Sequence, residues 1–198
     1  MAHNPDIPRC QWVPPKDELY CHYHDTEWGV PNYDSKSLFN KLILDGMQAG
    51  LSWITILRKR PEILKAFDGL DPDIVAYYTD KDRERLLGNP GIIRSKLKIN
   101  AAISNAQIFI KMRDEEDLDF SEYCWGFVGG KPVQNTWIDN SQVPARSEEG
   151  DALAKDLKKR GFKFTGPVIV YAFMQAVGMI NDHLVDCHVY DSVKRAAK

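Results

Sequence analysis

The stretch Asp151-Ala-Leu-Ala-Lys-Asp-Leu-Lys-Lys-Arg-Gly-Phe-Lys-Phe-Thr-Gly-Pro-Val-Ile-Val-Tyr-Ala-Phe-Met-Gln-Ala-Val-Gly-Met179 decides the fold. It predicts a helix over residues 151–160, a turn over Gly161–Gly166, and a strongly apolar helix from Pro167 to about Met179. Glycine suits the residue just past a helix end, and proline suits the first turn of the next helix. Two helices joined by so short a turn form a helix-hairpin-helix.

Short helical patterns recur on the N-terminal side of this hairpin, and alternating strand patterns are almost absent. The clearest helix covers residues 35–49, where Asp34 or Ser35 can cap the start and an apolar arc follows. The sequence therefore predicts an all-α helical bundle in one domain over residues 1–198, ordered from about 9 to 190. Further helices are predicted at 61–68, 71–78, 80–87, 95–112 and 119–127, with a surface loop at 128–150 held by Trp137.

Size and composition limit the possible functions. A chain of 198 residues with 43% hydrophobic content can bury one core. Its net charge of −2 excludes a globally basic nucleic-acid binder, so any contact with a polyanion must come from local clusters. No apolar run is long enough to span a membrane, and the start Met-Ala-His-Asn-Pro lacks the features of an export signal. We expect a cytoplasmic protein whose four cysteines serve as metal ligands or free thiols.

Three basic runs provide local clusters of positive charge. Lys158-Lys-Arg160 and Lys163 surround the start of the helix at Gly166-Pro167, where free N–H groups and the helix dipole attract a phosphate. The second run extends from Gly91 to Lys98, and the third is Arg58-Lys-Arg60. Each run alone is more often a solvated helix end. Together, in a slightly acidic chain, they indicate a polyanion-binding face.

Half of a possible metal site lies near each end of the chain. Cys10 and His24 come early, and His183-Leu-Val-Asp-Cys187 comes late. If the late segment is helical, His183 and Cys187 share a face. Two thiolates and two imidazoles are a usual ligand set of a closed structural zinc site. Unrelated buried residues are the alternative, and the other candidate ligands are His188, Cys21, Cys124 and His22.

Aromatic residues gather in the first third of the sequence. Tyr20, Tyr23 and His24 have helical spacing, and tryptophans lie at positions 12, 28 and 53. Such clusters are usually core. Asp45, at the edge of the apolar arc of the 35–49 helix, offers two possibilities. It either pairs with Lys41 on the surface or faces inward, where it would complete an aromatic pocket for a flat cationic ring such as an alkylated purine.

Several motifs, in order from residue 9 to about 190, resemble those of the 3-methyladenine DNA glycosylase I (TAG) family. They are Arg9-Cys-Gln-Trp-Val13, Tyr23-His-Asp-Thr-Glu-Trp-Gly-Val30, Gln48-Ala-Gly-Leu-Ser-Trp-Ile54, Gly91-Ile-Ile-Arg94, Lys159-Arg-Gly-Phe-Lys-Phe164, Tyr171-Ala-Phe-Met-Gln-Ala176 and Asn181-Asp-His183.

The resemblance implies a helix-hairpin-helix enzyme that flips 3-methyladenine out of alkylated double-stranded DNA and hydrolyses its N-glycosidic bond, releasing free 3-methyladenine. It implies structural zinc on Cys10, His24, His183 and Cys187. It also implies a base pocket of Tyr20, Tyr23, Trp53 and, as a weaker lining residue, Trp12, with Asp45 as the acidic recognition residue where the family pattern has Glu. Gly50-Leu51 matches the loop that fills the gap in the duplex, and further expected DNA contacts are Arg94, Lys98, Gly161, Lys163 and Gly166.

Water is the expected nucleophile, because an alkylated cationic base is already a good leaving group. No lysine is suitably placed in the sequence for a Schiff base, so strand cleavage is not expected. Asp182 follows the second hairpin helix, where many relatives in the wider superfamily carry a catalytic aspartate, but the family pattern gives it no such role. A monomer is expected. Two alternatives are a non-catalytic module that binds damaged DNA and a zinc hydrolase, which would need an open coordination position.

Overall fold

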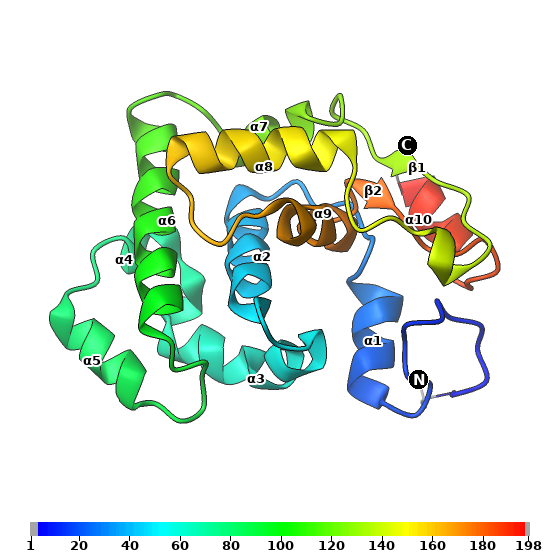
Figure 1. Cartoon of the computed structure of the whole chain (residues 1–198), viewed down its shortest axis with the longest axis horizontal. Coiled ribbons are helices and arrows are strands. Elements are labelled where there is room, and N and C mark those ends of the chain that lie inside the picture. The colour runs from blue at the N-terminus through cyan, green and yellow to red at the C-terminus, as the bar shows by residue number, and fades with distance from the viewer. Residues whose placement is uncertain (1–3, 197–198) are drawn as a thin grey trace.

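The computed structural model describes residues 4–196. Met1–His3, part of the N-terminal stretch that was predicted to lack an export signal, lie outside the described residues. Within residues 4–196 the chain is mainly α-helical, and the N- and C-terminal regions lie on the same side of the molecule (Figure 1). The first half contains α1 (Glu18–Thr26), α2 (Ser35–Gln48), α3 (Trp53–Ala66), the 3-10 turn η1 (Asp68–Leu70), α4 (Pro72–Val75), α5 (Asp80–Gly88) and α6 (Lys96–Asp114). The second half contains α7 (Phe120–Gly126), β1 (Val133–Gln134), η2 (Asn140–Gln142), α8 (Glu148–Arg160), α9 (Pro167–Ala176), β2 (Ile180–Asn181) and α10 (Tyr190–Ala196).

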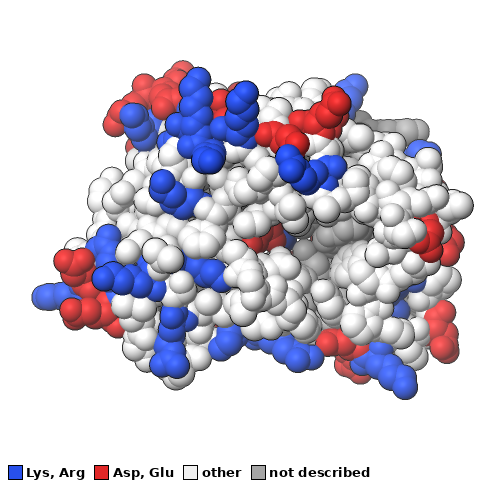
Figure 2. Space-filling model, in the orientation of Figure 1, with Lys and Arg blue, Asp and Glu red and all other residues white. Residues whose placement is uncertain are grey.

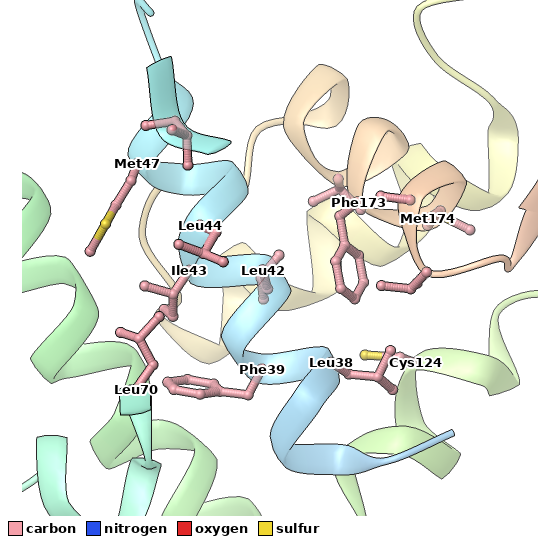
Figure 3. Packing of buried hydrophobic residues seen from close by; sticks show 14 of the residues in the cluster. Leu38, Phe39, Leu42, Ile43, Leu44, Met47, Leu70, Cys124, Phe173 and Met174 are labelled. Atoms are coloured by element: carbon pink, nitrogen blue, oxygen red, sulfur yellow. The ribbon is translucent and has the colours of Figure 1, made fainter. Parts of the chain in front are cut away.

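Helix α2 lies at the centre of the fold. It begins where the Asp34 side chain accepts a hydrogen bond from the Ser37 N–H at 2.7 Å, which confirms the predicted cap. Eight of its residues are buried, from Leu38 to Met47, so it packs on several sides at once. Figure 3 shows Leu38 and Leu42 facing α7 and α9, with Phe39 and Ile43 toward Leu70. Burial on this scale places side chains of α2 inside the molecule, where one of them can line a cavity.

Two packed helices, α8 and α9, occupy the residues of the predicted hairpin and are joined by a short turn. Gly161 ends α8 with φ = 100°, a left-handed conformation that glycine adopts without strain, and Pro167 occupies the first turn of α9. The turn is held from outside by the buried amide of Asn105 on α6, which donates to the Lys163 carbonyl at 3.0 Å and accepts from the Lys163 N–H at 2.8 Å. Helix α6 therefore fixes the position of the turn.

Some predicted elements have other boundaries. The helix predicted at 61–68 starts at Trp53, because the apolar residues on both sides of Pro61 are buried and keep one helix continuous. The segment from His183 to Cys187, whose two ligands would share a face if it were helical, is not a helix and contains turns. The predicted loop 128–150 contains β1, which pairs in parallel with β2, and the first turn of α8. Trp137 holds the loop as predicted, since its indole N–H donates to Asp182 at 2.7 Å.

No helix within residues 4–196 combines the length and the apolar character needed to cross a membrane.

Candidate functional site

The four predicted metal ligands converge in a buried cluster. Ligand atoms of Cys10, His24, His183 and Cys187 all lie within 4.8 Å of one another. The Cys10 sulfur is 3.5 Å from His183 Nδ1, and the Cys187 sulfur is 3.6 Å from both His24 Nε2 and His183 Nδ1. Contact with Cys10 also holds the pKa of the Cys187 thiol well below its usual range. This cluster could bind a metal ion, and its late half brings His183 and Cys187 together through turns, without a helix.

Both imidazoles are oriented by groups outside the cluster. His24 Nδ1 lies 2.8 Å from the Asp25 carboxylate, and His183 Nε2 lies 3.0 Å from the Trp28 carbonyl. Each remote nitrogen thus faces an acceptor, which leaves the other nitrogen of each ring with its lone pair toward the cluster. Oriented ligands of this kind are typical of metal sites. The rival ligand His188 points instead to Asp25, at 2.9 Å, outside the cluster of four.

Beside this cluster lies a cavity of about 350 Å³. Cys10 belongs both to the metal cluster and to the cavity wall. The cavity has partly polar walls contributed by α1, α2, α3, α9 and the loop before α8. Its lining includes all the side chains predicted to form the base pocket: Trp12, Tyr20, Tyr23, Asp45 and Trp53.

The aromatic rings of the pocket form two groups. Trp12 meets the Tyr20 ring edge-on, with centroids 5.5 Å apart and an interplanar angle of 62°. Tyr23 and Trp53 are tilted by 44° with centroids 5.2 Å apart, which leaves no room for a base between these two rings as they stand. Burial raises the pKa of Tyr23 well above its ordinary value, so its hydroxyl stays protonated. Together the rings give the cavity apolar surfaces and hydroxyl groups.

Asp45 faces inward, which is one of the two possibilities left open by the sequence, and its pair with Lys41 lies inside the molecule rather than on the surface. Its side chain is 3% exposed, and its Oδ1 contacts the ammonium of Lys41 one helical turn earlier. Burial raises the pKa of Asp45, and Lys41 partly offsets this effect. Asp45 Oδ2 and the indole nitrogen of Trp53 are buried without a hydrogen-bond partner among the described residues. Both residues line the cavity, so its wall contains one acceptor and one donor that no described residue satisfies.

The loop between α2 and α3 lies at the edge of the cavity, between Gln48 and Trp53, which both line it. Gly50 adopts φ = 76°, a conformation that favours glycine, and Leu51 follows with 41% of its surface exposed. Lys98 was expected to contact DNA, but its ammonium donates to the Met47 carbonyl at 2.9 Å and the Ala49 carbonyl at 2.6 Å. In this structure it holds the loop in place.

The basic runs differ in whether their side chains form ion pairs with other described residues. Arg94 and Lys163 are exposed, and neither side chain forms an ion pair within the part of the chain that is described. Gly161 and Gly166 flank Lys163 in the hairpin turn. Figure 2 shows basic side chains over α8 and on the α5–α6 side of one face. In the third run, two charges are paired with carboxylates of the chain itself. Arg58 pairs with Asp17 at 2.9 Å, and Arg60 pairs with Glu27 at 2.6 Å.

Asp182 lines the cavity but is saturated with hydrogen bonds. Its two oxygens accept from four side chains at 2.6–2.7 Å, those of Asn135, Trp137, Tyr171 and Gln175. A carboxylate with these acceptor positions filled is poorly suited to take a proton from water. Its position joins the loop 128–150 to α9, which is a structural role.

Comparison with known proteins shows the family to which the chain belongs. The sequence pattern of the family described as "Methyladenine glycosylase" matches residues 12–190. The chain belongs to this family. It is 47% identical over 186 residues to DNA-3-methyladenine glycosylase 1 of Escherichia coli strain K12, covering 94% of this chain and 98% of that protein.

Solved structures in the family have the same fold. A crystal structure of 3-methyladenine DNA glycosylase I (TAG) aligns with a TM-score of 0.89 at 48% identity, covering 91% of this chain and 98% of that one. The Staphylococcus aureus TAG, described as showing the structural basis of 3-methyladenine recognition, aligns with a TM-score of 0.85 at 40% identity, over 88% and 93% of the two chains.

Several residues that line the cavity were not predicted from the sequence. Lys41, Gln48 and Gln175 line it, as does the segment 143–145 of the predicted surface loop. The i,i+4 spacing to Asp45 contained the signal for Lys41, which was considered only as a surface partner. Nothing in the sequence indicated that the loop would reach the cavity, because its position depends on the pairing of β1 with β2.

Proposed function

We propose that this chain is a monofunctional DNA glycosylase that hydrolyses the N-glycosidic bond of 3-methyladenine in alkylated double-stranded DNA. The observation that carries the proposal is an aromatic cavity lined by Asp45, whose buried Oδ2 has no partner among the described residues, and by Trp53, whose indole N–H has none either. A carboxylate among aromatic faces favours a flat ring with positive charge and an exocyclic amine. An N3-methylated adenine in DNA has both.

In this proposal Asp45 accepts a hydrogen bond from the exocyclic amine, and Trp53 contributes a face on which the ring can stack. Tyr20, Tyr23 and Trp12 complete the walls. The aspartate is one methylene shorter than the glutamate of the family pattern, but its complete burial on α2 aims it into the cavity. Ordinary adenine, which is neutral, gains less from the carboxylate. Much of the selectivity then comes from charge.

The base must leave the duplex to enter a cavity of this depth. We propose that Leu51, exposed at the cavity edge, fills the space that the flipped nucleotide leaves. The phosphate backbone would then be held by the N–H groups at the start of α9, with Gly161 and Gly166 keeping the turn open and Lys163 and Arg94 adding charge. Lys98 contributes by holding the loop of Gly50 and Leu51.

A water molecule is the proposed nucleophile. The positive charge of the alkylated base makes it a good leaving group, so no strong general acid is required. Asp182 is excluded from the proposed chemistry by its four hydrogen bonds. A single-domain, monomeric protein acting in the cytoplasm fits the proposal.

We further propose that the cluster of Cys10, His24, His183 and Cys187 holds zinc in a structural role. A tetrahedral zinc ion with ligand distances of about 2.3 Å to sulfur and about 2.0 Å to nitrogen would separate neighbouring sulfur and nitrogen ligands by about 3.5 Å. The sulfur–nitrogen distances of 3.5–3.6 Å fit that value. Four protein ligands leave no open position for a substrate or a reactive water. The zinc would join α1 to the C-terminal region and so support the pocket.

Chromatography of the bases freed from methylated duplex DNA tests the function. Release of 3-methyladenine with intact strands is expected. A protein that retards methylated DNA without freeing any base would instead be a binding module.

A further inference from the structure

Lys41 makes the two contacts that the proposed function assigns to the base. Its ammonium pairs with Asp45 and lies 4.1 Å from the centroid of the Trp53 ring. A buried carboxylate and an indole face are the groups that would recognise a cationic ring. The position suited to a cation in the cavity is therefore already held by a positive charge of the chain itself.

The side chain of Lys41 also borders a second cavity outside the base pocket. This second cavity, of about 500 Å³, shares Lys41, Tyr23 and Ala176 with the first one. Its walls include the carboxylates of Glu27 and Asp34. The Lys41 side chain lines both cavities and is 15% exposed, and its flexible four-carbon stem can turn the ammonium from Asp45 toward these acidic groups.

We propose that Lys41 is a specificity-determining residue. Before the base binds, the Lys41 ammonium occupies the position beside Asp45 and the Trp53 ring, and the positively charged base displaces it from there. This inference rests on the proposed function and deepens it. Lys41 keeps Asp45 ionised before the base arrives. On binding, a cationic base takes over both contacts while the ammonium moves toward Glu27.

The exchange favours positive rings over neutral ones. A cationic base replaces one ion pair by another, so Asp45 stays compensated. A neutral base that displaces Lys41 leaves a buried carboxylate without a partner, which is strongly unfavourable. A neutral base that leaves Lys41 in place finds the face of Trp53 occupied. The resident ammonium thus adds a penalty against undamaged bases, which are the overwhelming majority in DNA.

Other charged groups face this pair and do not replace either member. Arg60 on α3 and Glu27 after α1 form their own two-point ion pair, at 2.6 and 2.8 Å. Tyr23 on α1 has its pKa raised by burial and so stays neutral. Burial lowers the pKa of Lys41, and Asp45 offsets the effect. Without Lys41, the buried carboxyl of Asp45 would lose the influence that lowers its pKa.

The test measures KM for release of 3-methyladenine from methylated duplex DNA at pH 6 and pH 9. It compares the wild-type chain, Lys41→Met, Lys41→Gln and the control Lys36→Met. Lys36 lies on the same helix but pairs with Asp71 and Asp73 at the surface. At pH 9 we expect Lys41→Met to lower KM by about tenfold, because the base no longer competes with the ammonium for a close charge pair.

At pH 6 the gain of Lys41→Met should be smaller than at pH 9, because the pKa of the buried Asp45 carboxyl rises further when Lys41 no longer lowers it. Lys41→Gln should shift KM in the same way, and it also decides the result if the methionine variant does not fold. Higher KM at both pH values would mean that Lys41 holds the base directly, and KM within twofold of wild type at both would mean a purely structural pair. Either result overturns the inference alone. No release by the wild-type chain would overturn the proposed function and this inference with it.

Discussion

Replacing Asp45 with asparagine tests how the cavity distinguishes a cationic base. The substitution keeps the shape of a side chain that is 3% exposed and removes only its charge. Oδ2 is the oxygen without a partner among the described residues, so the lost interaction is the one offered to the base. A hydrogen bond to a charged group contributes about 1.5–3 kcal/mol. Together with the lost attraction to a cationic ring, we expect kcat/KM to fall by about 30- to 150-fold, which corresponds to about 2–3 kcal/mol.

Asp73→Asn is the matched control, because Asp73 is a surface carboxylate that pairs with Lys36 and Arg113. Steady-state release of 3-methyladenine is measured for wild type and both variants, with thermal unfolding as a check on the fold. Asp45→Asn should remain folded, since the amide oxygen can still accept from Lys41, and Asp73→Asn should release base at the wild-type rate. Near-normal release by a folded Asp45→Asn variant would refute the assignment of Asp45 to base recognition.

Four further results are expected. The pKa of Asp45 is raised by burial, so activity that needs the carboxylate should be lost as pH falls through a value above the ordinary 3.8; a plateau reaching down to pH 4 would contradict this. Elemental analysis should find about one zinc per chain in wild type and in Cys21→Ser, and little in Cys187→Ser, whose unfolding temperature should drop by several degrees. Asn105→Ala, which removes both bonds to the hairpin turn, should raise KM for DNA with little change in the affinity for free base measured by tryptophan fluorescence; a change in base affinity alone would argue against a role in DNA contact. Leu51→Ala should slow single-turnover release, whereas Ile138→Ala, at a more exposed apolar position that does not line the cavity, should not.

Short-range patterns predicted the helices well, because caps and apolar periodicity are local properties. The cap of α2 at Asp34 and the left-handed Gly161 were both readable from the sequence. The exceptions arose where tertiary packing decided the outcome. A helix was predicted to begin at Pro61, yet burial of the residues around it makes α3 continuous from Trp53. The His183–Cys187 segment brings its ligands together through a turn, which spacing alone could not distinguish from a helix.

Most aromatic and acidic residues of the candidate site could be predicted from the sequence, but the positions of its lysine side chains could not. The helical wheel left Asp45 either paired at the surface or facing inward, and the family pattern assigned it to the pocket, as it assigned the four metal ligands to one site. The presence of Lys41 in the same cavity depends on how deeply α2 is buried between its neighbours. Lys98 likewise carried a charge suited to phosphate, but the nearby carbonyl groups of the α2–α3 loop engage it.

The central claim is that this chain frees 3-methyladenine from alkylated DNA through the cavity closed by Asp45. The most direct test is to incubate methylated duplex DNA with the purified chain and identify the released bases by chromatography. We expect 3-methyladenine to be the released base and the DNA strands to remain uncut. Retention of all methylated bases in the DNA, or release of undamaged adenine at a comparable rate, would contradict it.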